Sequence, residues 1–147
     1  MKFLIINPQL IFNSRDKLTT GIIYLPIAIA SISANLKKNG IDHRVLDLFG
    51  NNPKKINKLD NFYVLGESIK KYSEEIQSYD AIFVYANQVI NHLSIINIIK
   101  QIRSINKSVK IITFENTQNM FSDSFNKSLM QSTKYDTTIS PAATSII

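Results

Sequence analysis

Short apolar runs of strand length alternate along this chain with longer segments whose apolar residues recur at helical spacing. Residues 3–6 form a continuous apolar run that ends at Asn7 and Pro8, and residues 81–86 form a second one. Strands that are apolar on both faces belong to parallel sheets that helices cover on both sides. The alternation therefore predicts an α/β fold.

Five strand segments and the helices between them limit the possible topologies. Connections between parallel strands are right-handed, and five strands then favour the flavodoxin-like (Rossmann-like) order 2-1-3-4-5. We expect the strands at residues 3–6, 43–48, 81–86, 109–114 and 137–139. We expect the helices at residues 26–39, 65–79, 93–106 and 121–130, with polar connections at residues 9–24 and 50–61.

The length of 147 residues suits a single domain that spans residues 1–147. A doubly wound unit of this order normally carries a helix after its fifth strand, and residues 141–147 are too short to form one. We therefore expect the final helix to be missing or very short. The sequence then has the character of a fragment or a component, whose uncovered sheet face needs another chain or domain or stays exposed.

The positive charge of the chain predicts a solvated cationic surface. Lys and Arg number 17 against 11 Asp and Glu, which gives a net charge of +6. Only three of these cations are Arg, and the lysines are scattered in pairs. Nucleic-acid binders gather Lys and Arg on one face and rely on Arg for phosphate and base contacts. We therefore expect no nucleic-acid partner.

Apolar stretches in this sequence are short. None approaches the roughly 20 apolar residues of a membrane span. The run at residues 3–6 is also too short for the core of a signal peptide. We expect a chain without a membrane span that works in the cytoplasm.

Missing residues and motifs exclude several kinds of chemistry. The chain has no Cys, so it can hold neither a disulfide nor an iron–sulfur cluster of its own. No glycine-rich phosphate loop or nucleophile elbow follows any strand. Asn7 and Asn87 stand where a phospho-acceptor receiver domain needs acidic residues. An enzyme acting on small nucleotides or sugars is a weaker alternative, because no acid–base pair converges on one place.

The predicted ligand site is the crevice beyond the carboxyl ends of the strands, where the strand order reverses. Amide side chains gather there after the first and third strands, and the segments after the fourth and fifth strands extend the same rim. The residues at this site are Asn7, Pro8 and Gln9, then Asn87 and Gln88, and at the rim Glu115, Asn116 and Ser140.

Two histidines and one aspartate have competing interpretations. His92 follows the third strand and is a candidate metal ligand, although a lone His at a helix start is more often a surface or capping residue. His43 lies at the amino end of the sheet, away from the crevice. Asp47 ends the second strand, where it could contact a ligand hydroxyl or make the hydrogen bonds of a turn.

The ordered motifs of the first fifty residues resemble those of a known family. The first strand ends in Asn7-Pro8-Gln9, Leu25-Pro26 begins a helix rich in small residues that stops at Gly40, and the next strand ends in Asp47. This pattern is similar to the cobalamin-binding domain at the N-terminus of many radical-SAM enzymes. The later segments 80–86 and 109–114 also fit that domain.

The resemblance implies a cofactor-binding domain that is not catalytic alone. It implies that cobalamin is held above the ends of the first and third strands, and that a catalytic radical-SAM domain or chain supplies the iron–sulfur cluster. The implied cofactor-binding residues are Asn7, Pro8, Gln9, Leu25, Pro26, Asn87, Gln88, Glu115, Asn116 and Ser140.

Departures from the family pattern favour an alternative. Glu115-Asn116 stands where the family has a Gly-Gly pair, and Ser140-Pro141 stands where it has a Gly-Glu-Gly stretch. Bulky or charged residues at these places obstruct the buried tail of the cofactor. The alternative is a degenerate, cofactor-free domain that acts as a protein-interaction or scaffolding module.

Overall fold

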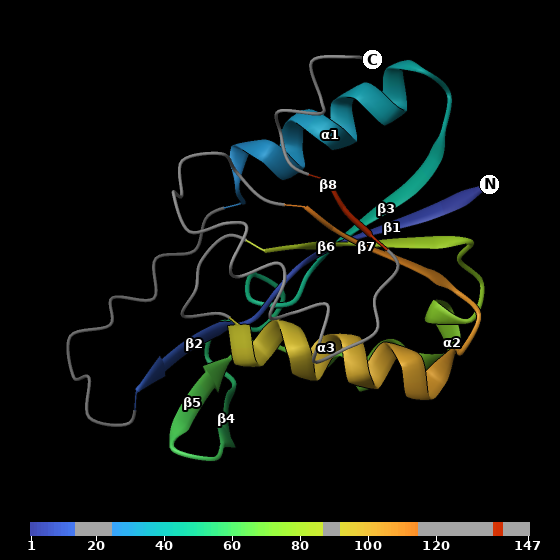
Figure 1. Cartoon of the computed structure of the whole chain (residues 1–147). Coiled ribbons are helices and arrows are strands. Elements are labelled where there is room, and N and C mark those ends of the chain that lie inside the picture. Colours follow the sequence, from blue (N-terminus) through green and yellow to red (C-terminus); the bar gives the residue numbers. More distant parts are fainter. Residues whose placement is uncertain (14–24, 87–91, 115–136, 140–147) are drawn as a thin grey trace.

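A parallel sheet forms the centre of the computed structural model, which describes residues 1–13, 25–86, 92–114 and 137–139 (Figure 1). Four strands lie in the order β3-β1-β6-β7, and β8 pairs in parallel with β7 at the edge. The strands are β1 (Lys2–Asn7), β3 (Asp42–Asp47), β6 (Ala81–Tyr85), β7 (Lys110–Phe114) and β8 (Thr137–Ile139). The predicted α/β class is confirmed, whereas the helix expected at residues 121–130 lies outside the described residues.

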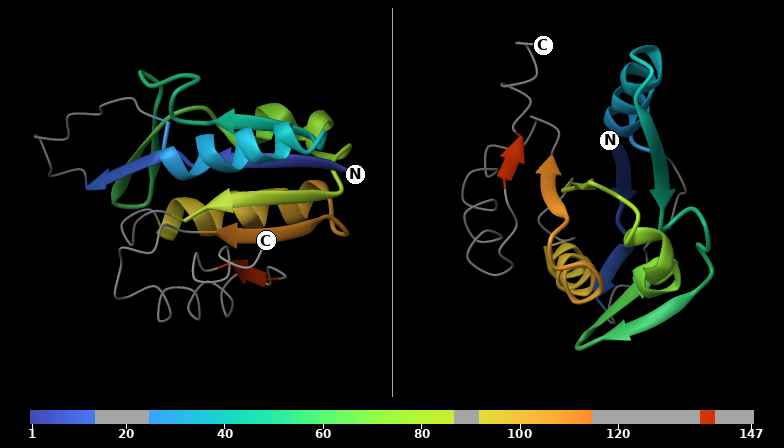
Figure 2. Two further views of the ribbon diagram at one scale, coloured as in Figure 1. Left: turned by 90° about the horizontal axis from the view of Figure 1, so that it is seen from above. Right: turned by 90° about the vertical axis from the view of Figure 1, so that its right-hand side faces the viewer.

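Helices cover both faces of this sheet (Figure 2). One face packs against α1, and the opposite face packs against α2 and α3. Their bounds, with those of the short 3-10 helix η1 that precedes α2, are α1 (Ile27–Lys38), η1 (Ile69–Tyr72), α2 (Ser73–Ile76) and α3 (His92–Ile105).

Alternate residues of β1 point into two separate cores, as the period of a strand requires. Leu4 and Ile6 belong to the core on the α3 side, and Ile5 belongs to the core on the α1 side together with Ile29. Among the described residues, the first core has 16 buried members and the second has four. Most of the described core residues therefore lie on the side of the sheet that α2 and α3 cover.

The end of α1 matches the expected glycine stop. Ile41 donates its backbone N–H to the carbonyl of Leu36 at 3.0 Å, and Gly40 donates to the carbonyl of Lys37 at 3.1 Å. Gly40 has a φ of +67°, which is the left-handed conformation that this C-terminal motif requires. The helix predicted at residues 26–39 is confirmed within one residue at each end.

A second sheet, which is antiparallel, was absent from the prediction. Its strands lie in the order β2-β5-β4. The expectation of polar connections at residues 9–24 and 50–61 is wrong where β2 and β4 form, because both short strands pair along their whole length with the central strand β5. The strands are β2 (Leu10–Asn13), β4 (Ile56–Leu59) and β5 (Phe62–Leu65).

The continuous helix predicted at residues 65–79 is also wrong. Leu65 ends β5, and Gly66 has a φ of +126°, which a right-handed helix cannot contain. The helical residues in this stretch are confined to η1 and α2. Ser68 caps the start of η1, because its side chain accepts a hydrogen bond from the backbone N–H of Lys70. The apolar stripe nevertheless faces the core, since Ile69 and Ile76 are fully buried.

Gly66 is the point at which the antiparallel sheet touches the end of β3. A Cβ atom at this position would lie 2.5 Å from the carbonyl oxygen of Leu48, which is backbone and cannot move aside. Both the positive φ and this close approach require a residue without a side chain. The two sheets can therefore meet only because position 66 is glycine.

We predict that Gly66→Ala destabilises the protein far more than Gly40→Ala. Gly66→Ala combines a positive φ with a backbone clash and is expected to cost at least about 3 kcal/mol. Gly40→Ala is the matched control, because no atom of the described residues beyond its chain neighbours lies within 4 Å of its Cβ position, and only the backbone penalty of about 1–2 kcal/mol applies. Urea unfolding of the two variants measures both values, and equal losses would contradict the close approach at Gly66.

Candidate functional site

The carboxyl edge of the parallel sheet is the first place to examine for a binding site. The connection from β1 to β3 contains α1 on one face, and the connections from β3 to β6 and from β6 to β7 contain α2 and α3 on the other. The direction of winding therefore changes between β1 and β6. In open α/β sheets, ligands bind beyond the strand ends at such a point.

Asn7 and Asp47 meet at this edge, because they are opposite residues at the ends of β1 and β3. The side-chain nitrogen Nδ2 of Asn7 donates to Oδ1 of Asp47 at 2.9 Å. The backbone N–H of Gly50 donates to the same oxygen at 2.9 Å, and Leu48 donates to the carbonyl of Asn7 at 3.0 Å. Of the two interpretations of Asp47, the structure supports the turn.

The other predicted residues of the edge differ in accessibility. Asn7, Pro8 and Gln9 are all buried, and Pro26 is buried at the start of α1. Leu25, in contrast, is 43% exposed. His92 is the first residue of α3, and its side chain is outside the description. The predicted residues outside the described part of the chain are Asn87, Gln88, Glu115, Asn116 and Ser140.

A corrin ring fits only part of this arrangement. Because Asn7, Pro8 and Gln9 are buried, these three residues present little side-chain surface against which a flat ring could rest. After Gln9 the chain continues directly into β2. Leu25 is the predicted residue that stays accessible among those described.

His43 lies away from this edge, as the sequence predicts. It pairs in register with Phe3 near the amino ends of β3 and β1. One ring nitrogen, Nε2, lies 2.8 Å from Oγ of Ser33 on α1, and the other, Nδ1, lies 2.9 Å from the carbonyl of Ile41. The Nε2 contact therefore joins α1 to β3, and the Nδ1 contact holds the short connection between them.

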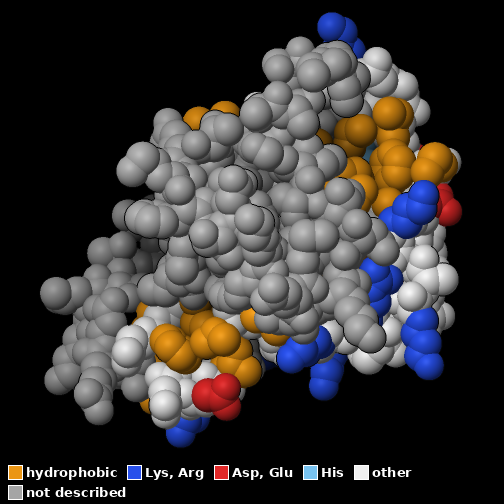
Figure 3. Space-filling view, in the orientation of Figure 1, with side chains coloured by type: hydrophobic (Ala, Val, Ile, Leu, Met, Phe, Trp, Pro, Cys, Tyr) orange, Lys and Arg blue, Asp and Glu red, His pale blue; other side chains and the backbone are white. Residues whose placement is uncertain are grey.

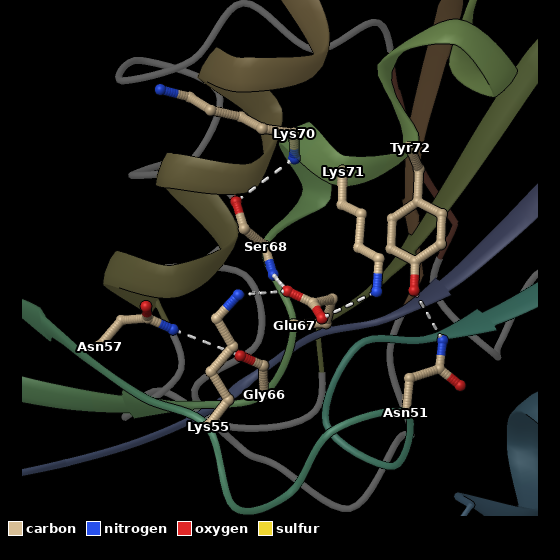
Figure 4. A network of polar contacts seen from close by, with 9 residues as sticks. All are labelled: Asn51, Lys55, Asn57, Gly66, Glu67, Ser68, Lys70, Lys71 and Tyr72. Atoms are coloured by element: carbon tan, nitrogen blue, oxygen red, sulfur yellow. Dashed lines mark hydrogen bonds and ion pairs between the residues drawn. The ribbon is translucent and has the colours of Figure 1, made fainter.

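The strongest polar network beside the edge centres on Glu67, which sequence reasoning did not select (Figure 4). Only 4% of this residue is exposed. Its carboxylate accepts from Nζ of Lys55 at 2.6 Å, from Nζ of Lys71 at 3.1 Å and from the backbone N–H of Ser68 at 3.1 Å. These hydrogen bonds, that of Lys55 foremost, lower the pKa of Glu67 to about 2.

Backbone hydrogen bonds extend this network from the antiparallel sheet to the end of β3. Glu67 donates its N–H to the carbonyl of Leu48 at 2.7 Å, and Gly66 donates to the carbonyl of Lys55 at 2.9 Å. Asn57 of β4 donates from Nδ2 to the carbonyl of Gly66 at 3.3 Å. Glu67 therefore fixes the second sheet beside the carboxyl edge of the first.

Two of the lysines that we interpreted as solvated surface have this specific role. The sequence pairs Lys55 with Lys54 and Lys71 with Lys70. In each pair, the second lysine forms an ion pair with Glu67. The spacing of four residues between Glu67 and Lys71 was a signal for this contact. The partner lysine at 55 is distant in sequence and gave no such signal.

Comparison with protein-family models, with curated proteins and with solved structures finds no significant match to this chain. Across the described ranges, no three His, Asp or Glu side chains gather as a metal ion would require. In the same ranges, no helix is both long and apolar enough to cross a membrane. The family, the cofactor and the cytoplasmic location stay predictions from the sequence.

We predict that Glu67→Gln removes a pH-dependent part of the stability. The folded-state pKa of Glu67, about 2, is below its usual value of 4.5, so its stabilisation is complete above pH 5 and is lost as the pH falls toward 2. The difference in unfolding free energy between wild type and Glu67→Gln should therefore shrink over this range.

Glu74→Gln is the matched control, because Glu74 is an exposed carboxylate on α2. Chemical denaturation at pH 6, 4 and 2.5 gives the comparison. A difference between wild type and Glu67→Gln that stays constant across these pH values would contradict the assigned role of the carboxylate.

Proposed function

We propose that this chain is a flavodoxin-like binding domain with a five-stranded sheet in the order 2-1-3-4-5, which works together with a catalytic domain or chain. The observation that carries the proposal is the change of winding between β1 and β6, which creates a ligand position at the carboxyl edge. Two polar side chains described at that edge, Asn7 and Asp47, bind each other, and Asp47 also accepts from the backbone of Gly50, so both help to form the edge.

Cobalamin is the ligand that we propose for this edge, on the strength of the sequence resemblance. Bound cobalamin supplies a methyl group carried on cobalt, and a radical-SAM partner supplies the iron–sulfur cluster. Leu25 is the described residue available for contact with the ligand, while Asn7, Pro8 and Gln9 support the edge from within. The remaining proposed contacts are Asn87, Gln88, Glu115, Asn116 and Ser140, with His92 as the proposed metal ligand.

Hydroxocobalamin tests this proposal with the full chain. We predict a change in the visible spectrum of the cofactor and its co-elution with the protein on gel filtration. Leu25→Glu should weaken binding about tenfold or more, because an apolar contact is lost and a charge is placed beside the ring. Ile56→Glu is the matched control, since Ile56 is an exposed apolar residue on β4.

An unchanged spectrum without co-elution would remove cobalamin from the account. Equal binding by wild type and Leu25→Glu would remove Leu25 from the contact surface. Neither result depends on the activity of a partner enzyme.

A protein-interaction module is the second candidate function, and the surface of α1 favours it. Ile29 is the one buried residue of this helix, whereas Ile27 is 84% exposed and Leu25, just before it, is 43% exposed. Figure 3 shows hydrophobic side chains gathered at the upper right of one face, beside the N-terminus of the chain, and again at its lower left, with Lys and Arg at the edges of that face. An apolar surface of this kind is typical of a contact with another protein.

Ile27→Lys tests this second function. We predict that wild-type chain retains a defined partner from extracts of its source cells, and that Ile27→Lys loses this partner because a charge replaces an apolar contact. Ile56→Lys should keep it. Mass spectrometry of the captured proteins gives the comparison, and identical capture by both variants would contradict a partner surface on α1.

A further inference from the structure

A cavity of about 180 Å³ lies between α3 and the antiparallel sheet, and Gln9, one of the residues predicted at the carboxyl edge, belongs to its described lining. Its described lining contains four carboxamides, one hydroxyl, two lysines and two apolar side chains, without a carboxylate. These residues are Gln9, Asn57, Lys58, Leu59, Val64, Ser68, Lys70, Asn97 and Gln101. The lining therefore offers mainly hydrogen-bonding groups and positive charge.

The α3 side of the cavity carries a row of polar residues at helical spacing. Asn97 and Gln101 are four residues apart, and Nε2 of Gln101 donates to Oδ1 of Asn97 at 2.9 Å. Ser94 lies one turn earlier in the same row and is fully buried. The row lies on a helix whose neighbouring face consists of buried isoleucines, such as Ile98 and Ile102.

Hydrogen-bonding capacity is left unused in this row. The Oε1 atom of Gln101 is buried, and no described residue donates to it; the same holds for Oγ of Ser94. A buried acceptor without a donor costs free energy that a bound hydroxyl or water recovers. Gln101 lines the cavity, so a turn of its side chain would bring this acceptor to a molecule bound there.

The opposite wall supplies positive charge. Lys70 is exposed, and Figure 4 shows its side chain extending toward α3, whereas Lys71 turns toward Glu67. Among the described residues, Glu67 forms ion pairs with Lys55 and Lys71, and neither Lys70 nor Lys58 has a carboxylate partner. The lysines at the cavity are therefore available to a negatively charged group.

We propose that this cavity binds a small hydroxylated anion. Ligand hydroxyls exchange hydrogen bonds with the carboxamides and donate to Gln101, while Lys70 and Lys58 neutralise a phosphate or carboxylate group. The volume equals that of about six water molecules and is smaller than the pockets that hold drug-sized ligands. The ligand class is therefore a short polyol phosphate or hydroxy acid. Among the described residues, the site shares only Gln9 with the one proposed for cobalamin.

Glycerol 3-phosphate is the probe for this proposal, with glycerol and inorganic phosphate as matched controls. We expect saturable chemical-shift changes in the side-chain amide signals of Gln9, Asn97 and Gln101 in ¹⁵N NMR spectra of the full chain. Each control lacks one half of the recognised chemistry and should bind at least about tenfold more weakly. Absence of saturable changes with glycerol 3-phosphate, or equal affinity for inorganic phosphate, would overturn the proposal.

Two variants separate ligand recognition from a structural role. Gln101→Leu removes the unpaired acceptor, so binding should weaken about tenfold or more while the unfolding midpoint stays the same or rises. Lys70→Gln should reduce the preference for glycerol 3-phosphate over glycerol. Lys54→Gln, at an exposed lysine outside the lining, is the control for charge.

Wild-type affinity in both Gln101→Leu and Lys70→Gln would overturn the assignment of these residues. Displacement of glycerol 3-phosphate by hydroxocobalamin would also overturn it, since the two sites would then be one.

Discussion

The contact between Glu67 and its two lysines is the interaction on which the arrangement of the two sheets depends. A carboxylate that is only 4% exposed is costly unless it is paired, and here Lys55 and Lys71 approach it from different segments. Those segments lead into β4 and α2, so one side chain joins the antiparallel sheet to the helical side of the parallel sheet. Gly66 allows the junction, because any side chain there would meet the backbone of Leu48.

Both candidate binding places follow from this junction. Asn7 and Asp47 shape the carboxyl edge. The next residue after Asp47 is Leu48, whose carbonyl accepts the backbone N–H of Glu67. The polar cavity exists because β4 and β5 are held beside α3. Its lysines, Lys58 and Lys70, stay available because Glu67 pairs with Lys55 and Lys71 instead. A change in the attachment of the second sheet therefore affects both places, while the parallel sheet retains its own two cores.

The parallel sheet could be predicted because its strands are apolar on both faces and its main helices have clear periodicity. The antiparallel sheet could not, since β2 and β4 have four residues each and depend on pairing with β5. A signal was present in Phe62–Leu65, an aromatic and β-branched run that follows the turn at Asp60, where φ is +52°. The spacing between Glu67 and Lys71 was a local signal for one half of the Glu67 network, whereas its contact with Lys55 is a tertiary one that no local pattern contains.

The most direct test of this account is the hydrogen exchange of the backbone amides of Gly66 and Glu67 at neutral pH. These two N–H groups donate to Lys55 and Leu48, across the junction of the sheets. We predict that they exchange as slowly as the amides of β1 in the parallel sheet. Exchange at the rate of an unprotected amide, while the amides of β1 stay protected, would show that the antiparallel sheet is not held in place and would contradict the account.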